Sequence, residues 1–260
     1  MSDPRVIAAA SGAIGTITLQ HPKANSYDLA FMKELDAAIE SHVNSSAVKV
    51  VVMKSGLDKF FSAGADIKAF QANSSEQNMQ MIRFAHNTLR KTANSPKVFI
   101  AAINGHALGG GLEMALACDL RFAGDGNFML GLPEVTLGLL PGNGGTQRLP
   151  RLIGRTKALD MMITGTPVDP KTAHELGFVD KLFPPDRLLD ETMSYANKLA
   201  AGATLAIGRI KQAVYEGMEV SLDEALSLER DLMAPLFETA DAKEGIAAFA
   251  EKRQPTYTGR

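Results

Sequence analysis

A glycine-rich segment followed by a glutamate carries residue types suited to catalysis. Residues 105–113 read GHALGGGLE and follow an apolar run at 98–103. Glycines let a substrate approach the main chain closely, and a helix that starts among them presents N–H groups and the positive end of its dipole. Such a helix start is an anion site. Glu113 lies about one helical turn beyond Gly110, so its carboxylate could act on whatever these N–H groups hold.

A second glycine-bearing segment is a candidate partner for the first. Residues 61–68 read FSAGADIK and follow another apolar run at 48–53. Ligands of an α/β sheet bind beyond the carboxyl ends of its strands, so both glycine loops would lie at the same edge. Two main-chain N–H groups that converge on one oxygen from separate loops form an oxyanion hole. Asp66 can also cap a short helix, which does not exclude the other role.

Glu134 is the second candidate acid. It follows Pro133, whose ring fixes the backbone angle φ, and the residues around it are apolar: Met129, Leu130, Leu132, Val135 and Leu137. An apolar setting raises the pKa of a carboxyl group and makes Glu134 a candidate proton donor near neutral pH.

Each segment also has a simpler interpretation. The glycines could serve only close packing of a helix on a strand, with Glu113 and Glu134 as ordinary charges in the first turn of a helix. A phosphate-binding loop fits poorly because no Gly-Lys-Ser/Thr follows, and the Gly-x-Gly-x-x-Gly spacing of a dinucleotide site is absent. The two glutamates become informative only beside an oxyanion site.

The elements that must position these residues alternate between strands and helices. The hydrophobic pattern predicts strands at residues 7–10, 14–19, 48–53, 98–103, 120–123 and 179–183. It predicts helices from a cap at Asp28 to about residue 43, at about 76–93 and at 112–117. Continuous apolar runs are typical of parallel strands buried on both faces, so we predict an α/β fold with a mostly parallel sheet.

From about residue 186 the pattern becomes helical. Residues 221–224 and 241–244 both have the form of a capping box, with Ser221 and Asp241 as the capping residues. We therefore predict an α/β core over residues 1–185, which carries both glycine loops and both glutamates, and a C-terminal helical region over residues 186–260. The helical region would pack on its own core or on a partner subunit.

Composition argues against several classes of protein. The 260 residues are 45% hydrophobic, carry a formal net charge of -2 and contain no block of Lys and Arg, so nothing supports nucleic-acid binding. No apolar stretch approaches the roughly 20 residues of a membrane span. The single cysteine, Cys118, fits a reducing compartment, and no signal peptide is recognisable, so we expect a cytoplasmic protein. The five histidines are scattered and predict no metal site.

Five segments, in order, resemble the signatures of the enoyl-CoA hydratase/isomerase (crotonase) superfamily. They are FSAGADIK at 61–68, NGHALGGGLE at 104–113, LPE at 132–134, PGNGGTQRL at 141–149 and the stretch at 244–253. The resemblance covers nearly the whole chain. It implies a crotonase-like spiral of ββα units with a C-terminal α-helical region, assembled as a homo-oligomer, either a trimer or a dimer of trimers. It also implies an acyl-CoA thioester substrate and no separate cofactor, because coenzyme A is part of the substrate.

The resemblance assigns roles to individual residues. The N–H groups of Ala65 and Gly110 would form the oxyanion hole, and Glu113 and Glu134 match the two glutamates that flank the reacting carbons in hydratases. Further substrate contacts would come from Lys23, Ala24, Ala63, Asp66, Ile67, Lys68, Gly109, Leu132, Pro133, Gly142 and Lys252. Tyr27 stands where many relatives carry leucine and would add bulk and a hydroxyl near the expected substrate entrance.

Because both acids are present, we predict an enoyl-CoA hydratase of fatty acid metabolism. It would add water reversibly, in the syn sense, to a 2-enoyl-CoA and give a 3-hydroxyacyl-CoA. Glu113 would act as the base on water and Glu134 would supply the proton to C2. One alternative is a double-bond isomerase, in which a single glutamate shuttles a proton, or another acyl-CoA lyase of the family. A second alternative is a non-catalytic acyl-CoA-binding subunit.

Overall fold

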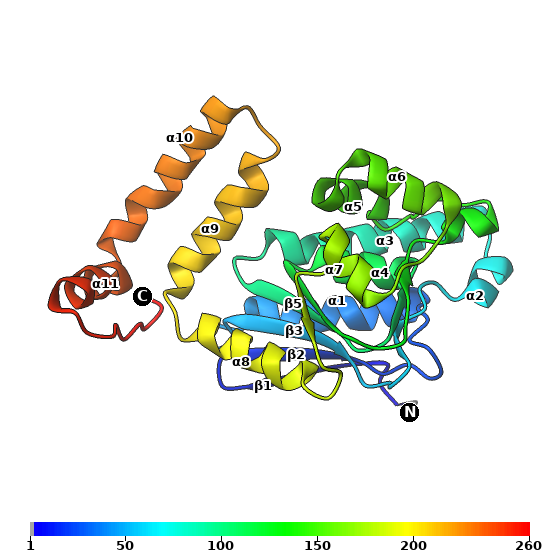
Figure 1. Ribbon diagram of the computed structural model, residues 1–260, viewed down its shortest axis with the longest axis horizontal. Helices are drawn as coiled ribbons and strands as arrows, with labels where there is room; N and C mark the ends of the chain where they lie inside the picture. Colours follow the sequence, from blue (N-terminus) through cyan, green and yellow to red (C-terminus); the bar gives the residue numbers. More distant parts are fainter. Residues whose placement is uncertain (1–2) are drawn as a thin grey trace.

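A six-stranded sheet lies at the centre of the computed structural model, which describes residues 3–260 (Figure 1). Its strands, in spatial order, are β1 (Val6–Ser11), β2 (Ile14–Leu19), β3 (Val50–Ser55), β5 (Val98–Ile103), β7 (Leu120–Gly124) and β9 (Lys181–Phe183). β1 and β2 pair antiparallel, and every later neighbouring pair is parallel. The prediction of an α/β fold with a mostly parallel sheet is therefore confirmed.

The strand boundaries follow the apolar runs with small shifts. β5 spans the predicted residues and is buried at every position. β3 begins at Val50 instead of residue 48, because Val48 is already packed in the core before the strand pairing starts. β9 begins at Lys181 for the same reason, since Phe178 and Val179 are core residues of the connection that leads into it. An apolar run therefore marks burial more reliably than it marks the first ladder hydrogen bond.

A second, smaller sheet was not predicted. It contains β4 (Phe60–Ser62), β6 (His106–Leu108) and β8 (Leu130–Gly131), all parallel. Each of these strands follows a strand of the large sheet in the chain, and a helix comes next, so the core repeats a ββα unit as expected. Strands of two or three residues are too short to show a hydrophobic period, which is why the sequence pattern does not reveal them.

The helices up to β9 are α1 (Leu29–Asn44), α2 (Ile67–Ala72), α3 (Ser75–Asn94), α4 (Gly110–Ala117), the 3₁₀ helix η1 (Glu134–Leu137), α5 (Gly145–Ile153), α6 (Arg155–Thr164) and α7 (Pro170–Leu176). Asp28 caps α1 as predicted, because its carboxylate accepts the N–H of Phe31 at 2.8 Å. Within residues 3–260, no helix combines the length and the apolar character that crossing a membrane requires.

Helices alone follow β9 in the described chain. α8 (Leu188–Ala200) packs on the large sheet, where Leu188 and Ala196 join the apolar cluster of β3, β5 and β7. α9 (Thr204–Gly217) and α10 (Leu222–Met233) pack against each other and project from the core, which α9 contacts beside β5. The 3₁₀ helix η2 (Ala234–Glu238) leads to α11 (Ala240–Glu251) at their far end (Figure 1). We call α9, α10, η2 and α11 the arm.

One of the two predicted helix caps in the arm is correct. Ser221 and Glu224 form the capping box of α10. The prediction at Asp241 is wrong, because Thr239 caps α11 by accepting the N–H of Ala242. Asp241 is only 3% exposed, and its carboxylate accepts the N–H groups of Thr258 and Gly259 from the returning C-terminal tail. The side chain of Asp241, which the local pattern predicts as a helix cap, therefore forms tertiary hydrogen bonds instead.

A buried lysine fixes the base of the arm. Lys211 of α9 is 7% exposed, and its Nζ donates to Asp119 Oδ2 at 2.8 Å and to the carbonyl of Thr92 at 2.6 Å. The hydroxyl of Tyr215, one turn further along α9, donates to Asp119 Oδ1. Burying an ammonium group is tolerated only when it is paired and hydrogen-bonded in this way. The orientation of α9 is therefore set by polar contacts as well as by packing.

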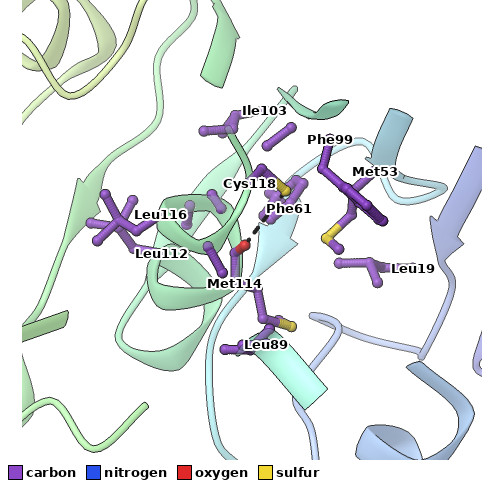
Figure 2. Close-up of a cluster of buried hydrophobic side chains, with 14 of the residues drawn as sticks. Leu19, Met53, Phe61, Leu89, Phe99, Ile103, Leu112, Met114, Leu116 and Cys118 are labelled. Carbon is purple, nitrogen blue, oxygen red and sulfur yellow. Dashed lines mark hydrogen bonds between the residues drawn. The ribbon is translucent and has the colours of Figure 1, made fainter. Parts of the chain in front are cut away.

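The helix that carries Glu113 is buried along its whole length. Figure 2 shows Leu112, Met114, Leu116 and Cys118 of this segment among core side chains such as Phe61. Cys118 is a buried small residue, as predicted, with its Sγ 3.7 Å from the carbonyl oxygen of Met114. A helix that is buried at every residue has little freedom to shift, so it presents Glu113 in one fixed position.

Candidate active site

A turn at Gly109 starts helix α4 two residues earlier than predicted. Gly109 has φ 53°, a left-handed conformation that glycine adopts without strain, and its N–H donates to the carbonyl of Gly131 at 2.9 Å. Gly110 is then the first residue of the helix, so its N–H has no carbonyl within the helix to bond. Gly111 is needed for packing, because an ideal Cβ there would lie 2.1 Å from the carbonyl oxygen of Ser62. The glycines therefore serve both close packing and a buried helix start whose first N–H has no partner within the helix.

The loop that carries Ala65 touches this helix end. An ideal Cβ on Gly64 would lie 3.1 Å from the nitrogen of Gly110 and 2.8 Å from the carbonyl oxygen of Leu108. The two loops follow β4 and β6, which are adjacent parallel strands of the small sheet. The carboxyl ends of these strands thus bring the two predicted N–H donors, at Ala65 and Gly110, into neighbouring loops.

Glu113 is buried and held at one oxygen. It is 1% exposed, and its Oε1 accepts the N–H groups of Asn143 and Gly145, each at 2.7 Å. Gly145 begins α5, so the carboxylate also lies at the positive end of a helix dipole. Burial raises the pKa of Glu113, and the two N–H donors and the charge of Arg148 oppose that shift. Within residues 3–260 no hydrogen bond reaches Oε2, which remains available to act on a ligand.

Arg148 holds the segment that supplies these N–H groups. Its Nη1 donates to the carbonyl of Asn143 at 2.8 Å. Gly144, with φ 104°, leaves the space that this guanidinium occupies, since an ideal Cβ there would lie 2.2 Å from Nη1. Arg148, Asn143 and Gly145 were not among the site residues predicted from the sequence. The pair Gly144-Gly145 at the start of a helix could have indicated that this segment presents free N–H groups.

Glu134 is the less tightly held of the two acids. It begins η1, and its Oε1 lies 3.0 Å from the position that a Cβ on Gly109 would occupy. Its Oε2 is buried and has no hydrogen-bond partner among the described residues. Burial, followed by the negative charge of Glu113, raises the pKa of Glu134 to about 7. Glu134 can therefore carry a proton near neutral pH while Glu113 accepts hydrogen bonds.

The other residues predicted to contact substrate fall into three groups. Those in or beside the loops described above are Ala24, Ala63, Asp66, Gly109, Leu132, Pro133 and Gly142. Asp66 does cap α2, accepting the N–H of Lys68 at 2.8 Å. Lys23, Ile67 and Lys68 are exposed at the outer side of these loops. Lys252 follows α11 at the far end of the arm, so the fold does not bring it to the acids of its own chain (Figure 1).

Tyr27, predicted to lie near the substrate entrance, is buried against the start of α4. It is 3% exposed, and an ideal Cβ on Gly110 would lie 1.9 Å from its Oη. Asn143 Nδ2 donates a short hydrogen bond, 2.5 Å long, to the same oxygen. Tyr27 and Asn143 are 116 residues apart in the sequence, so no local sequence pattern could predict this contact.

The structure gives the histidines and acids no grouping suited to a metal. Among residues 3–260, no three His, Cys, Asp or Glu side chains lie close enough together to hold an ion. His106, beside the glycine loop, has a structural contact instead: its Nδ1 accepts the N–H of Met129 at 3.0 Å.

Comparison with known proteins gives one consistent result. A model of the family described as Enoyl-CoA hydratase/isomerase matches residues 9–260. A Rhizobium meliloti (strain 1021) protein named "Probable enoyl-CoA hydratase" is 40% identical, and the match spans 100% of both chains. The "Short-chain-enoyl-CoA hydratase" of Clostridium acetobutylicum is 36% identical over 96% of this chain and 95% of its own.

A solved structure extends the likeness to three dimensions. The crystal structure of an enoyl-CoA hydratase from Geobacillus kaustophilus HTA426 matches with a TM-score of 0.97 and 47% identity, over 100% of this chain and 98% of that one. Sequence and fold therefore point to the same group of proteins.

Proposed function

The chain belongs to the enoyl-CoA hydratase/isomerase family, and from that membership we propose that it is an enoyl-CoA hydratase. It adds water reversibly to the 2,3 double bond of a 2-enoyl-CoA and gives a 3-hydroxyacyl-CoA. One observation carries the proposal: two glutamates in different electrostatic settings lie beside the touching loops of Ala65 and Gly110. The relatives named above as hydratases support the same reaction.

In the proposed mechanism the thioester oxygen accepts the N–H groups of Ala65 and Gly110. This polarises the enoyl group, and C3 becomes electrophilic. Glu113 takes a proton from water as the oxygen bonds to C3, and Glu134 gives its proton to C2 of the enolate. A pKa of about 7 lets Glu134 act as a proton donor near neutral pH. The two N–H groups that donate to Glu113 favour its ionised form, which can act as the base. The two carboxyl groups interact, so they titrate as a coupled pair.

The remaining site assignments belong to the same proposal. Ala24, Ala63, Asp66, Gly109, Leu132, Pro133 and Gly142 would line the bound thioester, and Lys23, Ile67 and Lys68 would meet its nucleotide part. Lys252 lies at the far end of the arm, so it would reach the nucleotide part only from a neighbouring copy. Coenzyme A enters as part of the substrate, and the reaction we propose uses no further cofactor. The cytoplasmic location predicted from the sequence remains a prediction.

Hydration of crotonyl-CoA tests the function directly. We expect the purified protein to remove the enoyl absorbance of crotonyl-CoA and to form 3-hydroxybutyryl-CoA, measured by ultraviolet absorbance and chromatography. An isomerase would instead convert a 3-enoyl-CoA to the 2-enoyl product without adding water. A non-catalytic subunit would bind both thioesters and change neither, which would overturn the proposal.

We further propose that the arm mediates assembly into a trimer or a dimer of trimers. Many of its large apolar side chains are exposed, including Ile210, Met218, Leu222, Ile246 and Phe249. Another apolar surface lies on η1, the connection that follows it and α6, where Leu137, Leu140, Leu159 and Ile163 are exposed. Apolar surface of this extent on both parts fits an interface in which the arm of one copy covers a neighbour.

The oligomeric state can be checked by light scattering after size exclusion. We expect a mass three or six times that of the chain. Phe249 is 87% exposed, and Phe249→Asp should lower the mass because it places a charge in the apolar contact. Asp231→Asn, a change between polar side chains on α10, should leave it unchanged. A wild-type protein that stays monomeric at micromolar concentration would refute this assembly.

A further inference from the structure

Tyr27 connects the two loops that carry the oxyanion donors. Its N–H donates to the carbonyl of Gly64 at 2.9 Å, and its carbonyl accepts the N–H of Asp66 at 2.8 Å, so its main chain is paired with the Ala65 loop. The side chain ends against Gly110, where an ideal Cβ would lie 1.9 Å from Oη. The phenol therefore occupies the space that a side chain at Gly110 would fill, on the helix that presents Glu113.

Asn143 links this phenol to the catalytic carboxylate. Its side-chain Nδ2 donates to Tyr27 Oη, and its main-chain N–H donates to Glu113 Oε1 at 2.7 Å. Both Tyr27 and Asn143 are 3% exposed, so the pair is shielded from bulk water. One residue thus fixes the position of the phenol and of the acid relative to each other.

Hydrogen-bonding capacity is left over at this point. Tyr27 Oη accepts from Asn143, and among residues 3–260 its own O–H donates to no protein group. Asn143 Oδ1 and Glu134 Oε2 are buried and have no partner in the same part of the chain. Buried polar groups are nearly always paired, so a cluster of unused ones beside two acids indicates a polar ligand atom.

The phenol is a donor throughout the working pH range. Burial, followed by the charges of Glu113 and Glu134, raises the pKa of Tyr27 well above its ordinary value. A neutral phenol in the field of these two carboxyl groups has one O–H to donate and does not release its proton. Its partner must therefore be a hydrogen-bond acceptor that arrives with the substrate.

We propose that the O–H of Tyr27 donates a hydrogen bond to the oxygen that is added to C3, first as water and then as the 3-hydroxyl group. The inference rests on the proposed hydration reaction. A water molecule has two protons and two lone pairs. Its protons point to Glu113 and Glu134, one lone pair attacks C3, and the other accepts from Tyr27. One water O–H bond breaks and the O–C3 bond forms, with the proton going to Glu113, while C2 receives the proton of Glu134. Tyr27 gives up no proton.

The phenylalanine variant separates this contact from a steric role. Tyr27→Phe keeps the ring and removes only the hydroxyl. We expect its kcat for crotonyl-CoA to fall about tenfold with KM within about twofold, because one lost hydrogen bond corresponds to roughly that factor. Inhibition constants add a specific readout. The affinity for 3-hydroxybutyryl-CoA, which has the oxygen, should fall about tenfold, whereas that for butyryl-CoA, which lacks it, should stay within about twofold.

Tyr195→Phe is the matched control. Tyr195 packs on Phe122 in the apolar cluster between α8 and the large sheet. Loss of its hydroxyl should change none of these constants. Asn143→Ala provides a second variant that frees the phenol; it should show the same selective loss of 3-hydroxybutyryl-CoA affinity. Melting temperatures establish that each variant is folded.

The outcomes separate the inference from the function. If the wild-type protein does not hydrate crotonyl-CoA, the proposed function fails. If it does, and Tyr27→Phe keeps wild-type kcat and both inhibition constants, the function stands and the role of Tyr27 is refuted. Equal weakening of both inhibitors would also refute it, because the hydroxyl would then only shape the pocket.

Discussion

Replacing Glu134 with glutamine is expected to lower the turnover number for crotonyl-CoA about 1000-fold while acyl-CoA binding stays nearly unchanged. A positioned proton donor contributes about 100- to 10 000-fold to a rate. Glutamine preserves the shape of the side chain but has no proton to give to C2. The measurements are initial rates of hydration and the affinity for butyryl-CoA, determined side by side.

Glu175 offers a matched control. It is an exposed residue of α7, so Glu175→Gln makes the same chemical change away from the site and should leave both quantities unaltered. A Glu134→Gln enzyme that hydrates crotonyl-CoA within tenfold of the wild-type rate would remove Glu134 from the mechanism.

The pH profile is a second readout of the same variant. Hydration needs the protonated form of Glu134, whose pKa is raised to about 7, so kcat/KM should fall as the pH rises through about 7. Stability should change in the same direction. The pKa of Glu134 is about 7 in the folded chain and has its ordinary value of 4.5 in the unfolded chain, so the folded state binds the proton more tightly. The resulting contribution to stability is full below about pH 4.5 and is lost as the pH rises through about 7. Glutamine stays neutral, and Glu134→Gln should abolish both effects, seen in pH–rate profiles and in melting temperatures at pH 5 and pH 8.

Removing the N–H of Gly110 is expected to reduce hydration about 100- to 1000-fold. Loss of one oxyanion-hole donor typically has an effect of this size. Proline is tolerated at the first position of a helix, so Gly110→Pro removes the N–H without breaking an intrahelical hydrogen bond. The side chain of Tyr27, however, fills the space beside Gly110, and any Cβ there would clash with it.

A pair of double variants isolates the lost N–H from this clash. Tyr27→Ala makes room, so Gly110→Ala/Tyr27→Ala keeps the N–H and Gly110→Pro/Tyr27→Ala lacks it. We expect the proline version to turn over crotonyl-CoA at least about 100-fold more slowly than the alanine version. Equal rates in the two would show that the nitrogen of Gly110 does not hold the thioester oxygen.

The large sheet could be predicted because burial leaves a strong pattern in the sequence. The run at β5 is apolar at every residue. At six residues it has the length of a buried strand and is too short for a typical helix. The small sheet could not, because β4, β6 and β8 contain two or three residues each. Its existence decides where the site lies, since the loops of Ala65 and Gly110 extend from β4 and β6. The sequence therefore indicates the candidate segments of the site but not the small sheet that brings them together.

The two glutamates show the same difference between what the sequence indicates and what only the fold shows. Glu113 and Glu134 could be selected from their neighbours in the sequence. The N–H groups that hold Glu113 come from Asn143 and Gly145, which lie 30 and 32 residues away, and only the folded chain brings them together. Asp241 shows the opposite error, because its sequence context fits a helix cap but its hydrogen bonds go to the C-terminal tail. Local patterns select candidate residues, whereas partners distant in sequence decide how each side chain is held.

The ion pair between Lys211 and Asp119 has a consequence for how subunits would meet. Because α9 is anchored by a buried charge pair of its own chain, the direction of the arm is determined before any neighbour arrives. A preformed arm has few torsions left to order on docking, so association loses little conformational entropy. Newly made chains would then recognise one another as rigid bodies, without a folding step coupled to the encounter.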